Sequence, residues 1–183
     1  MQHKYSTHAI VLARYPAREG GLSVALLTHE LGLVHARAEG LRKPGSKLAH
    51  ALQTLSESEV TLLRGKEGWR LSGALLVRNW FIHLEPVARA RAGKRASLLL
   101  RLVQGETTDA RLYDLFKEFL ETLPERTEEE QDAAELLITL RMLSALGHDA
   151  GDIPNEEELR VMKNGNRRAL IDRISSGITA SGL

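Results

Sequence analysis

The sequence contains no cysteine in its 183 residues. This excludes disulfide bonds and thiolate metal sites, and it agrees with a protein of the cytoplasm. No apolar run is long enough to cross a membrane, and the polar N-terminus, with His3, Lys4 and Ser6, does not have the pattern of a signal peptide. We therefore expect a cytoplasmic protein that does not bind or cross a membrane.

Aromatic residues are also scarce, at 4%, so any surface that stacks on nucleic-acid bases must be small. Aspartate is missing from residues 1–80, which hold 11 Lys and Arg against 6 Glu, a net charge of +5. Residues 81–183 hold 14 Lys and Arg against 18 Asp and Glu, a net charge of −4. This asymmetry suggests one half that faces nucleic acid and a second half with another role.

The sequence lacks the patterns of a catalytic or metal site. Its seven histidines show no H-x-H or H-x-x-x-H spacing, so each is more typical of a surface or core side chain than of a metal ligand. Residues 40–47 read G-x-x-x-x-G-S-K, but a phosphate-binding loop needs Lys before the hydroxyl residue, and here Ser46 precedes Lys47. Helix capping explains the acidic run at 128–130. We therefore expect no enzyme activity, no metal and no cofactor.

Residues 5–79 show short apolar segments bounded by turns, which is typical of β-strands. Apolar and polar residues alternate most clearly at 33–39, and they alternate again at 69–77 after a hairpin-type turn at 64–68. At 69–77 the residues predicted to share one face are Trp69, Leu71, Gly73, Leu75 and Val77. The predicted strands are Ala9–Tyr15, Leu22–Thr28, Leu33–Glu39, Glu57–Leu63 and Trp69–Val77. Five short strands in succession favour a small antiparallel barrel of the OB type.

After Trp80 the apolar period becomes that of a helix. A basic helix that includes Arg89, Arg91, Lys94 and Arg95 is followed by an amphipathic helix at 112–123, which Pro124 ends. Thr127 and Glu130 form a capping box. The helix that it opens is apolar almost all round from 133 to 146, so we expect it to be the buried centre of a bundle, with a last helix at 166–178.

Together these patterns predict an α+β fold. A five-stranded OB-type β-barrel in a first domain, residues 1–80, is followed by an all-α helical bundle in a second domain, residues 81–183.

The most basic stretch is the predicted loop at 39–48, where Arg42, Lys43 and Lys47 flank a Pro-Gly pair. Pro and Gly prevent a regular helix or strand, so the cations project from a surface loop, which suits a polyanion such as a nucleic-acid backbone. A solvated basic turn is the alternative. Further cations fall on the predicted strands and turns of the same barrel: Arg14, Arg18, Arg37, Arg64, Lys66 and Arg70.

Two aromatic residues of the barrel, Tyr15 and Trp69, are candidates for stacking on bases. A core position for Trp69 and a turn anchor for Tyr15 are the alternatives. Because OB barrels also bind sugars and proteins, a protein-interaction scaffold that does not bind DNA remains an alternative function.

The chain resembles the RecO family of bacterial recombination-mediator proteins, in a short form without zinc. The resemblance covers most of the chain, and its most specific part is the basic loop together with the later R-G-x-x-G-W at 64–69. The segments that carry it are residues 9–12, 26–28, 40–48, 63–71, 140–148 and 174–183.

The resemblance implies binding of single- and double-stranded DNA and annealing of complementary strands. It also implies partnership with RecR and with the tail of single-strand-binding protein, through which the family loads RecA onto DNA. No catalytic residue comes with the family. The DNA-binding residues that it carries over are Arg42, Lys43 and Lys47 in the loop, followed by Arg64, Lys66 and Arg70.

One feature of the family is missing from this chain. Many members carry a cysteine zinc module after an L-x-x-L-G motif. In this chain the corresponding region, residues 149–165, is short and contains no cysteine. We therefore expect no zinc and a reduced helical domain.

The helical half is expected to bind the partner proteins. The family's single-strand-binding protein tail is acidic and apolar, so an apolar groove with a basic rim would suit it. Arg141, the one cation of the apolar central helix, is the candidate rim residue. An ordinary surface arginine whose stem covers the bundle is the alternative.

The basic loop yields the first prediction. If Arg42, Lys43 and Lys47 each neutralise one phosphate, each contributes roughly 0.7 to the slope of log K against log[salt] for single-stranded DNA. Replacing all three by Ala should therefore lower the slope by about 2, equally for unrelated sequences and with an unchanged melting temperature. An unchanged slope and an unchanged melting temperature would assign the loop to ordinary solvated surface.

Overall fold

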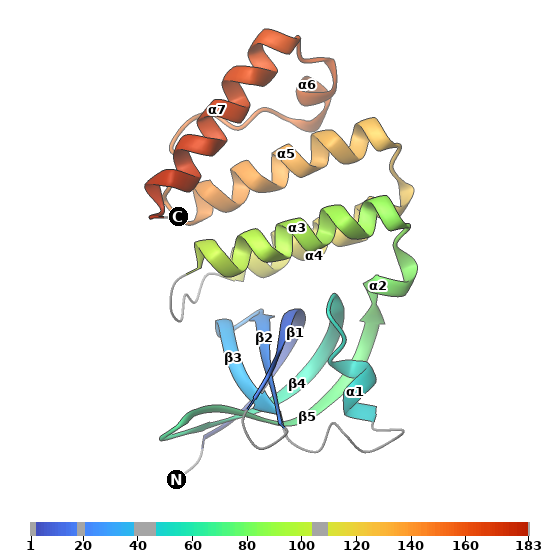
Figure 1. Ribbon diagram of the computed structural model, residues 1–183, viewed down its shortest axis with the longest axis vertical. Helices are drawn as coiled ribbons and strands as arrows, with labels where there is room; N and C mark the ends of the chain where they lie inside the picture. The colour runs from blue at the N-terminus through green and yellow to red at the C-terminus, as the bar shows by residue number, and fades with distance from the viewer. Residues whose placement is uncertain (1–2, 18–20, 39–46, 104–109, 183) are drawn as a thin grey trace.

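The computed structural model describes residues 3–17, 21–38, 47–103 and 110–182 (Figure 1). Its five strands are β1 His3–Pro16, β2 Leu22–Thr28, β3 Gly32–Ala38, β4 Ser56–Gly65 and β5 Gly68–Asn79. They close into a barrel in the order β1-β2-β3-β5-β4, in which only β3 and β5 are parallel. Helices follow the barrel, so the predicted α+β fold, an OB-type barrel followed by a helical part, is confirmed.

One short helix lies within the barrel segment and the other helices follow it. They are α1 Lys47–Ala51, between β3 and β4, and then α2 Trp80–His83, α3 Pro86–Leu102, α4 Ala110–Thr122, the 3₁₀ turn η2 Leu123–Glu125, α5 Glu128–Ala145, α6 Glu156–Val161 and α7 Asn164–Ala180. Figure 1 shows them as layers: α3 and α4 lie against the barrel, α5 lies beyond them, and α6 and α7 lie on the far side of α5. The prediction that α5 is the central helix is therefore confirmed.

Residues 9–12 of β1 and 24–28 of β2 are buried on both faces, which explains their unbroken apolar runs. Ala9 and Val11 belong to a core cluster with side chains from all five strands, so this cluster fills the barrel. Ile10 and Leu12 point the other way and join a second cluster with α3, α4 and α5. The outer face of the β1–β2 sheet is therefore the surface on which the helical part is packed.

Helix caps fix the start of two helices. In α5 the Thr127 side chain accepts from the Glu130 backbone N–H, and the Glu130 carboxylate accepts from the Thr127 N–H, which confirms the predicted capping box. Asn155 and Glu158 form the same reciprocal pair at the start of α6. The N-terminal dipole of each helix also favours the carboxylates that follow the cap.

The predicted alternation of β5 holds only over its first part. The pairing with β4 shifts between Thr61 and Leu62, so Ser72 is an extra residue in β5 and the side chains beyond it change faces. As a result Leu75, predicted to share a face with Leu71, is 67% exposed, whereas Leu71 is buried in the barrel. A bulge leaves no mark in an apolar pattern, and the expectation for the second half of β5 was therefore wrong.

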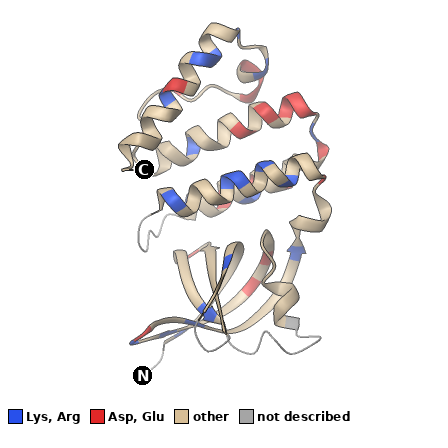
Figure 2. Ribbon diagram, in the orientation of Figure 1, with Lys and Arg blue, Asp and Glu red and all other residues tan. Residues whose placement is uncertain are grey.

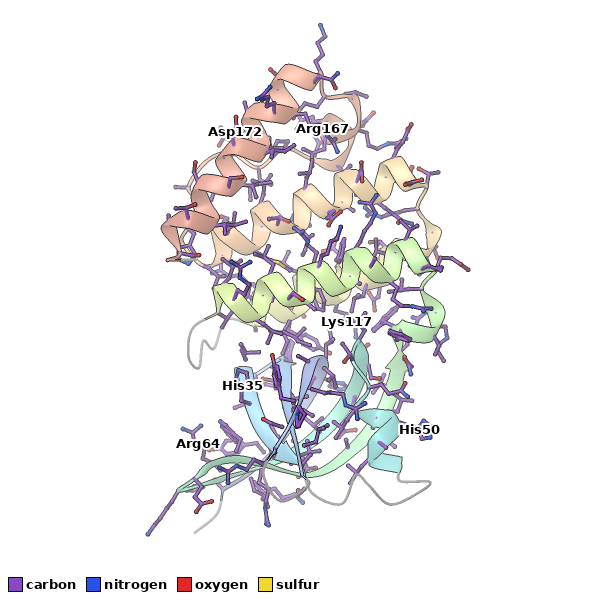
Figure 3. The ribbon with its side chains drawn as sticks, viewed as in Figure 1. His35, His50, Arg64, Lys117, Arg167 and Asp172 are labelled. Carbon is purple, nitrogen blue, oxygen red and sulfur yellow. The ribbon has the colours of Figure 1, made fainter. Side chains whose placement is uncertain are left out.

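A buried carboxylate joins the barrel to the helices. Glu57 of β4 is only 2% exposed, and it accepts hydrogen bonds from the Lys117 ammonium at 2.7 Å and the Tyr113 hydroxyl at 3.1 Å, both on α4. Burial and the negative charge of Glu57 raise the pKa of Tyr113, so this phenol stays protonated and remains a donor. In Figure 3 the Lys117 label lies between the helices and the barrel. The division into two domains at residue 80 stays a prediction.

The buried pair yields a stability prediction. Lys117→Met keeps the apolar stem but leaves the Glu57 carboxylate with Tyr113 alone, which should destabilise the protein by about 2–3 kcal/mol in urea unfolding. Adding Glu57→Gln should recover most of that loss, because no uncompensated charge then remains buried. Lys163→Met, at an exposed residue for which the described part of the chain records no ion pair, is the control. A Lys117→Met protein as stable as the control would show that the pair contributes nothing.

Candidate nucleic-acid interface

Four of the predicted DNA-binding cations gather at one end of the barrel. Arg37 lies near the end of β3, Arg64 near the end of β4, Lys66 in the β4–β5 turn and Arg70 at the start of β5. Arg37 and Arg70 are paired residues of the parallel β3–β5 ladder. A hollow of about 290 Å³ is lined by Arg37, Lys66 and Arg70 together with neighbouring residues of the hairpin. Figure 3 shows Arg64 on the same hairpin.

The strand register places three cations in one outward-facing row. Lys4 of β1 pairs with Leu63 of β4, Leu63 pairs with Arg70, and Arg70 pairs with Arg37. Directly opposed residues point to the same face of a sheet, so Lys4, Arg70 and Arg37 project together. All three are exposed. Lys4 was not predicted as a site residue because it precedes the apolar run by which β1 was recognised.

The hairpin turn brings Lys66 to the tip. Gly65 and Gly68 are the last paired residues of β4 and β5, so the loop between them has two residues and lies within the hairpin-type turn predicted at 64–68. Gly68 has φ +99°, a conformation that L side chains rarely adopt. Glycine at this position therefore permits the tight turn from which Lys66 projects.

One carboxylate lies within this basic cluster. Glu67 accepts a hydrogen bond from the Arg37 guanidinium at 3.2 Å, and both side chains are largely exposed. An exposed ion pair of this kind contributes less than about 1 kcal/mol, so a phosphate can replace it at low cost. Glu67 therefore competes weakly with an anionic ligand for Arg37.

The two candidate stacking residues occupy different environments. Trp69 is half-buried against the barrel core, with the Tyr5 ring edge-on at 5.2 Å and the Arg64 guanidinium 4.7 Å from its ring centre. The indole is thus largely used within the protein. Tyr15 is 44% exposed and lies near the C-terminal end of β1. It pairs with Ser23 of β2, and Ser23 in turn pairs with Arg37 of β3. Tyr15 extends the row of cations and is the more accessible ring.

The remaining predicted loop residues cannot be placed. Arg42 and Lys43 lie outside the described residues, as does Arg18. Lys47 is the first residue of α1, but its side chain also lies outside the described part. The loop therefore stays a prediction.

The predicted partner-binding residue, Arg141, lies in a groove between α4 and α5. It lines two adjoining hollows of about 120 and 300 Å³, which also share Leu115 and Glu118. Phe119, Ala134, Leu137 and Ile138 give the first hollow an apolar wall. Arg141 is 38% exposed on its side chain, and its guanidinium lies 3.6 Å from the Glu118 carboxylate. Arg126 lines the first hollow and Arg111 the second, two cations that the sequence pattern did not indicate.

Sites of two other kinds are missing from the described ranges. No group of three or more His, Asp or Glu side chains there is arranged to hold a metal ion. None of the helices in those ranges combines the length and the apolar character that crossing a bilayer requires.

Comparison with known proteins identifies the relatives of this chain. Residues 1–80 match the family described as "Recombination protein O N terminal". The protein named DNA repair protein RecO in Gloeobacter violaceus is 31% identical over 151 residues, 81% of this chain and 57% of its own length. The protein of the same name in Heliobacterium modesticaldum is 31% identical over 145 residues, 79% of this chain and 52% of its own.

A third protein of that name, from Dehalococcoides mccartyi, is 29% identical over 129 residues, 70% of this chain and 51% of its own length. The chain thus spans about half the length of these curated relatives. These matches confirm the resemblance to RecO proteins: residues 1–80 match the N-terminal part of the family, and the relatives from Gloeobacter violaceus and Heliobacterium modesticaldum are similar over 81% and 79% of the chain.

Proposed function

We propose that the protein is a non-enzymatic DNA-binding recombination mediator that acts in DNA repair in the cytoplasm. It binds single- and double-stranded DNA, anneals complementary strands, and with RecR helps to load RecA onto DNA coated with single-strand-binding protein. The observation that carries the proposal is the row of Lys4, Arg70 and Arg37 on the outer face of the barrel. The curated relatives named DNA repair protein RecO give independent support.

The mechanism of binding follows from the chemistry of this row. Its cations come from three strands of a closed barrel, so the spacing of their backbones is fixed before DNA binds. Binding therefore costs conformational entropy mainly in the long side chains themselves. Cations that neutralise phosphates release counterions, which supplies affinity without reading bases. Sequence-independent binding is what a protein needs in order to bring together any two complementary strands.

A protein-interaction scaffold is the second candidate, and it is supported by the exposed apolar residues of β5 and α2. Leu75 and Ile82 are 67% and 68% exposed, and three further exposed apolar residues lie between them in sequence, Leu76, Val77 and Phe81. The two functions differ in their response to salt. Binding through phosphates weakens steeply as salt rises, whereas binding through an apolar surface changes little.

The row of cations yields a prediction for DNA binding. The triple variant Lys4→Ala/Arg37→Ala/Arg70→Ala should lower the salt slope of single-stranded DNA binding by about 2, roughly 0.7 for each phosphate that is no longer neutralised. Its melting temperature should stay close to that of the wild type, since exposed cations contribute little stability. A fluorescence-anisotropy titration at several salt concentrations measures the slope.

Two controls make this measurement specific. Glu67→Gln frees Arg37 from its carboxylate and should raise DNA affinity, the opposite direction from the triple variant. Lys163→Ala/Arg168→Ala removes two exposed cations of α7 and its N-cap and should leave the slope unchanged. If the triple variant binds DNA with the wild-type slope, the barrel row is not the DNA site.

The α4–α5 groove yields a prediction for the protein partner. Arg141→Ala should weaken binding of an acidic, apolar peptide with the sequence of a single-strand-binding protein tail by about tenfold, the effect of removing one charge-assisted hydrogen bond. Arg168→Ala, on another helix, should leave the affinity as it is. Equal affinities of wild type and Arg141→Ala in a fluorescence titration would make Arg141 an ordinary surface arginine.

A further inference from the structure

Helix α3 carries positive charge only. Its 17 residues include Arg89, Arg91, Lys94, Arg95 and Arg101 and no carboxylate. Figure 2 shows α3 with blue segments alone, whereas the start of α5 beside it is red. The net charge of −4 for residues 81–183 therefore conceals a separation of charge between neighbouring helices.

Two of these cations are used inside the bundle. Arg91 is bound by Asp132 at 2.5 Å and Glu135 at 2.6 Å, and the Arg95 guanidinium lies 3.2 Å from Glu135. Both arginine side chains are mostly buried. The acidic residues of α5 that are nearest to α3 are thus occupied by these inward-facing arginines, which hold the two helices together.

Arg89 has a local role. Its guanidinium lies over the ring of Phe81 at 4.2 Å and donates to the carbonyl of Leu84 at 2.9 Å. It therefore fixes the short turn between α2 and α3.

The other two cations face solvent on one stripe of the helix. Lys94 and Arg101 are seven residues apart, with Ala90 and Ser97 on the same exposed stripe. No ion pair involving Lys94 or Arg101 is found within the described ranges. The small side chains between and beside them leave room for another molecule to approach the helix closely.

We propose that this exposed stripe of α3 binds the backbone of a second nucleic-acid strand, an inference that rests on the proposed function in strand annealing. Two strands that anneal are both polyanions and repel each other until their phosphates are neutralised. A rise of 1.5 Å per residue separates Lys94 from Arg101 by about 10 Å, which corresponds to about three nucleotides of a B-form strand. The ligand class is a nucleic-acid backbone.

The position of α3 makes it a second surface and not a continuation of the first. In Figure 1 the β4–β5 hairpin projects from the end of the barrel that is remote from the helices, and α3 lies over the other end. Ile10 and Leu12 of β1 pack in the core cluster that includes Ala88 and Leu99 of α3. The barrel therefore separates the two basic surfaces and holds them at a fixed spacing.

The test uses the full chain and the double variant Lys94→Ala/Arg101→Ala. Lys163→Ala/Arg168→Ala removes the same charge from α7 and its N-cap and is the matched control. Isothermal titration calorimetry measures how many oligonucleotides each chain binds. The oligonucleotides are about 8 nucleotides long, which is within the site size of one OB fold. The rate at which complementary strands anneal is measured with the same proteins by fluorescence quenching, and melting temperatures check folding.

The expected result is two oligonucleotides bound per wild-type chain and one per Lys94→Ala/Arg101→Ala chain, with annealing slowed at least tenfold. The matched control should behave as the wild type. The α3 variant could instead bind two oligonucleotides and anneal strands at the wild-type rate, while DNA binding still depends on Arg37 and Arg70. That result would overturn the proposal for α3 and leave the proposed function standing. Failure of the wild type to bind any oligonucleotide would overturn the proposed function and this inference with it.

Discussion

Residues 9–12 of β1 and 24–28 of β2 are buried on both faces, and this double burial fixes how the barrel and the helices pack together. Val11 faces the barrel core and Ile10 the helices, and neither is exposed. Each such side chain contributes about 1.5–3 kcal/mol when it leaves water, so the alternating inward and outward packing favours one arrangement of barrel and helices. A shift of β1 by one residue would exchange the two faces and disrupt both cores.

The same double burial determines where function can be located. The helices cover the outer face of β1 and β2 only around Ile10, Leu12, Ala25 and Leu27, so the hairpin end of the barrel stays open to a ligand. The cations Lys4, Arg37 and Arg70 lie at that hairpin end, where a backbone can approach without disturbing either core. Glu57 and Lys117 join β4 to α4, so the basic end of the barrel and the α4–α5 groove belong to one connected structure.

Local pattern and long-range pairing contributed differently to what the sequence predicted. The bounds of β2 were predicted without error because glycine-marked turns lie on either side of it, and the cap of α5 was predicted because Thr127 and Glu130 are close in sequence. The first residues of β1 were missed because they are held by pairing with β4, which no local pattern records. The bulge at Ser72 depends on the same kind of long-range pairing.

The candidate site was predictable to a similar extent. Composition and turn residues indicated the cations of the hairpin, since each lies in or beside a turn that the sequence marks with glycine. The inward pairing of Arg91 and Arg95 with α5 was not predictable, because basic residues on a helix do not reveal which of them meet a partner side chain 44 residues away. Because of this pairing, Arg91 and Arg95 hold the bundle together, whereas Lys94 and Arg101 of the same helix stay exposed.

In the proposed function this protein neutralises DNA backbones so that two strands can meet. The most direct measurement is the rate at which wild-type protein anneals complementary strands, first bare and then coated with single-strand-binding protein. We expect the protein to accelerate annealing in both cases, with an acceleration that falls steeply as salt rises. A rate equal to that of the strands alone, at low salt and with bare DNA, would contradict the account.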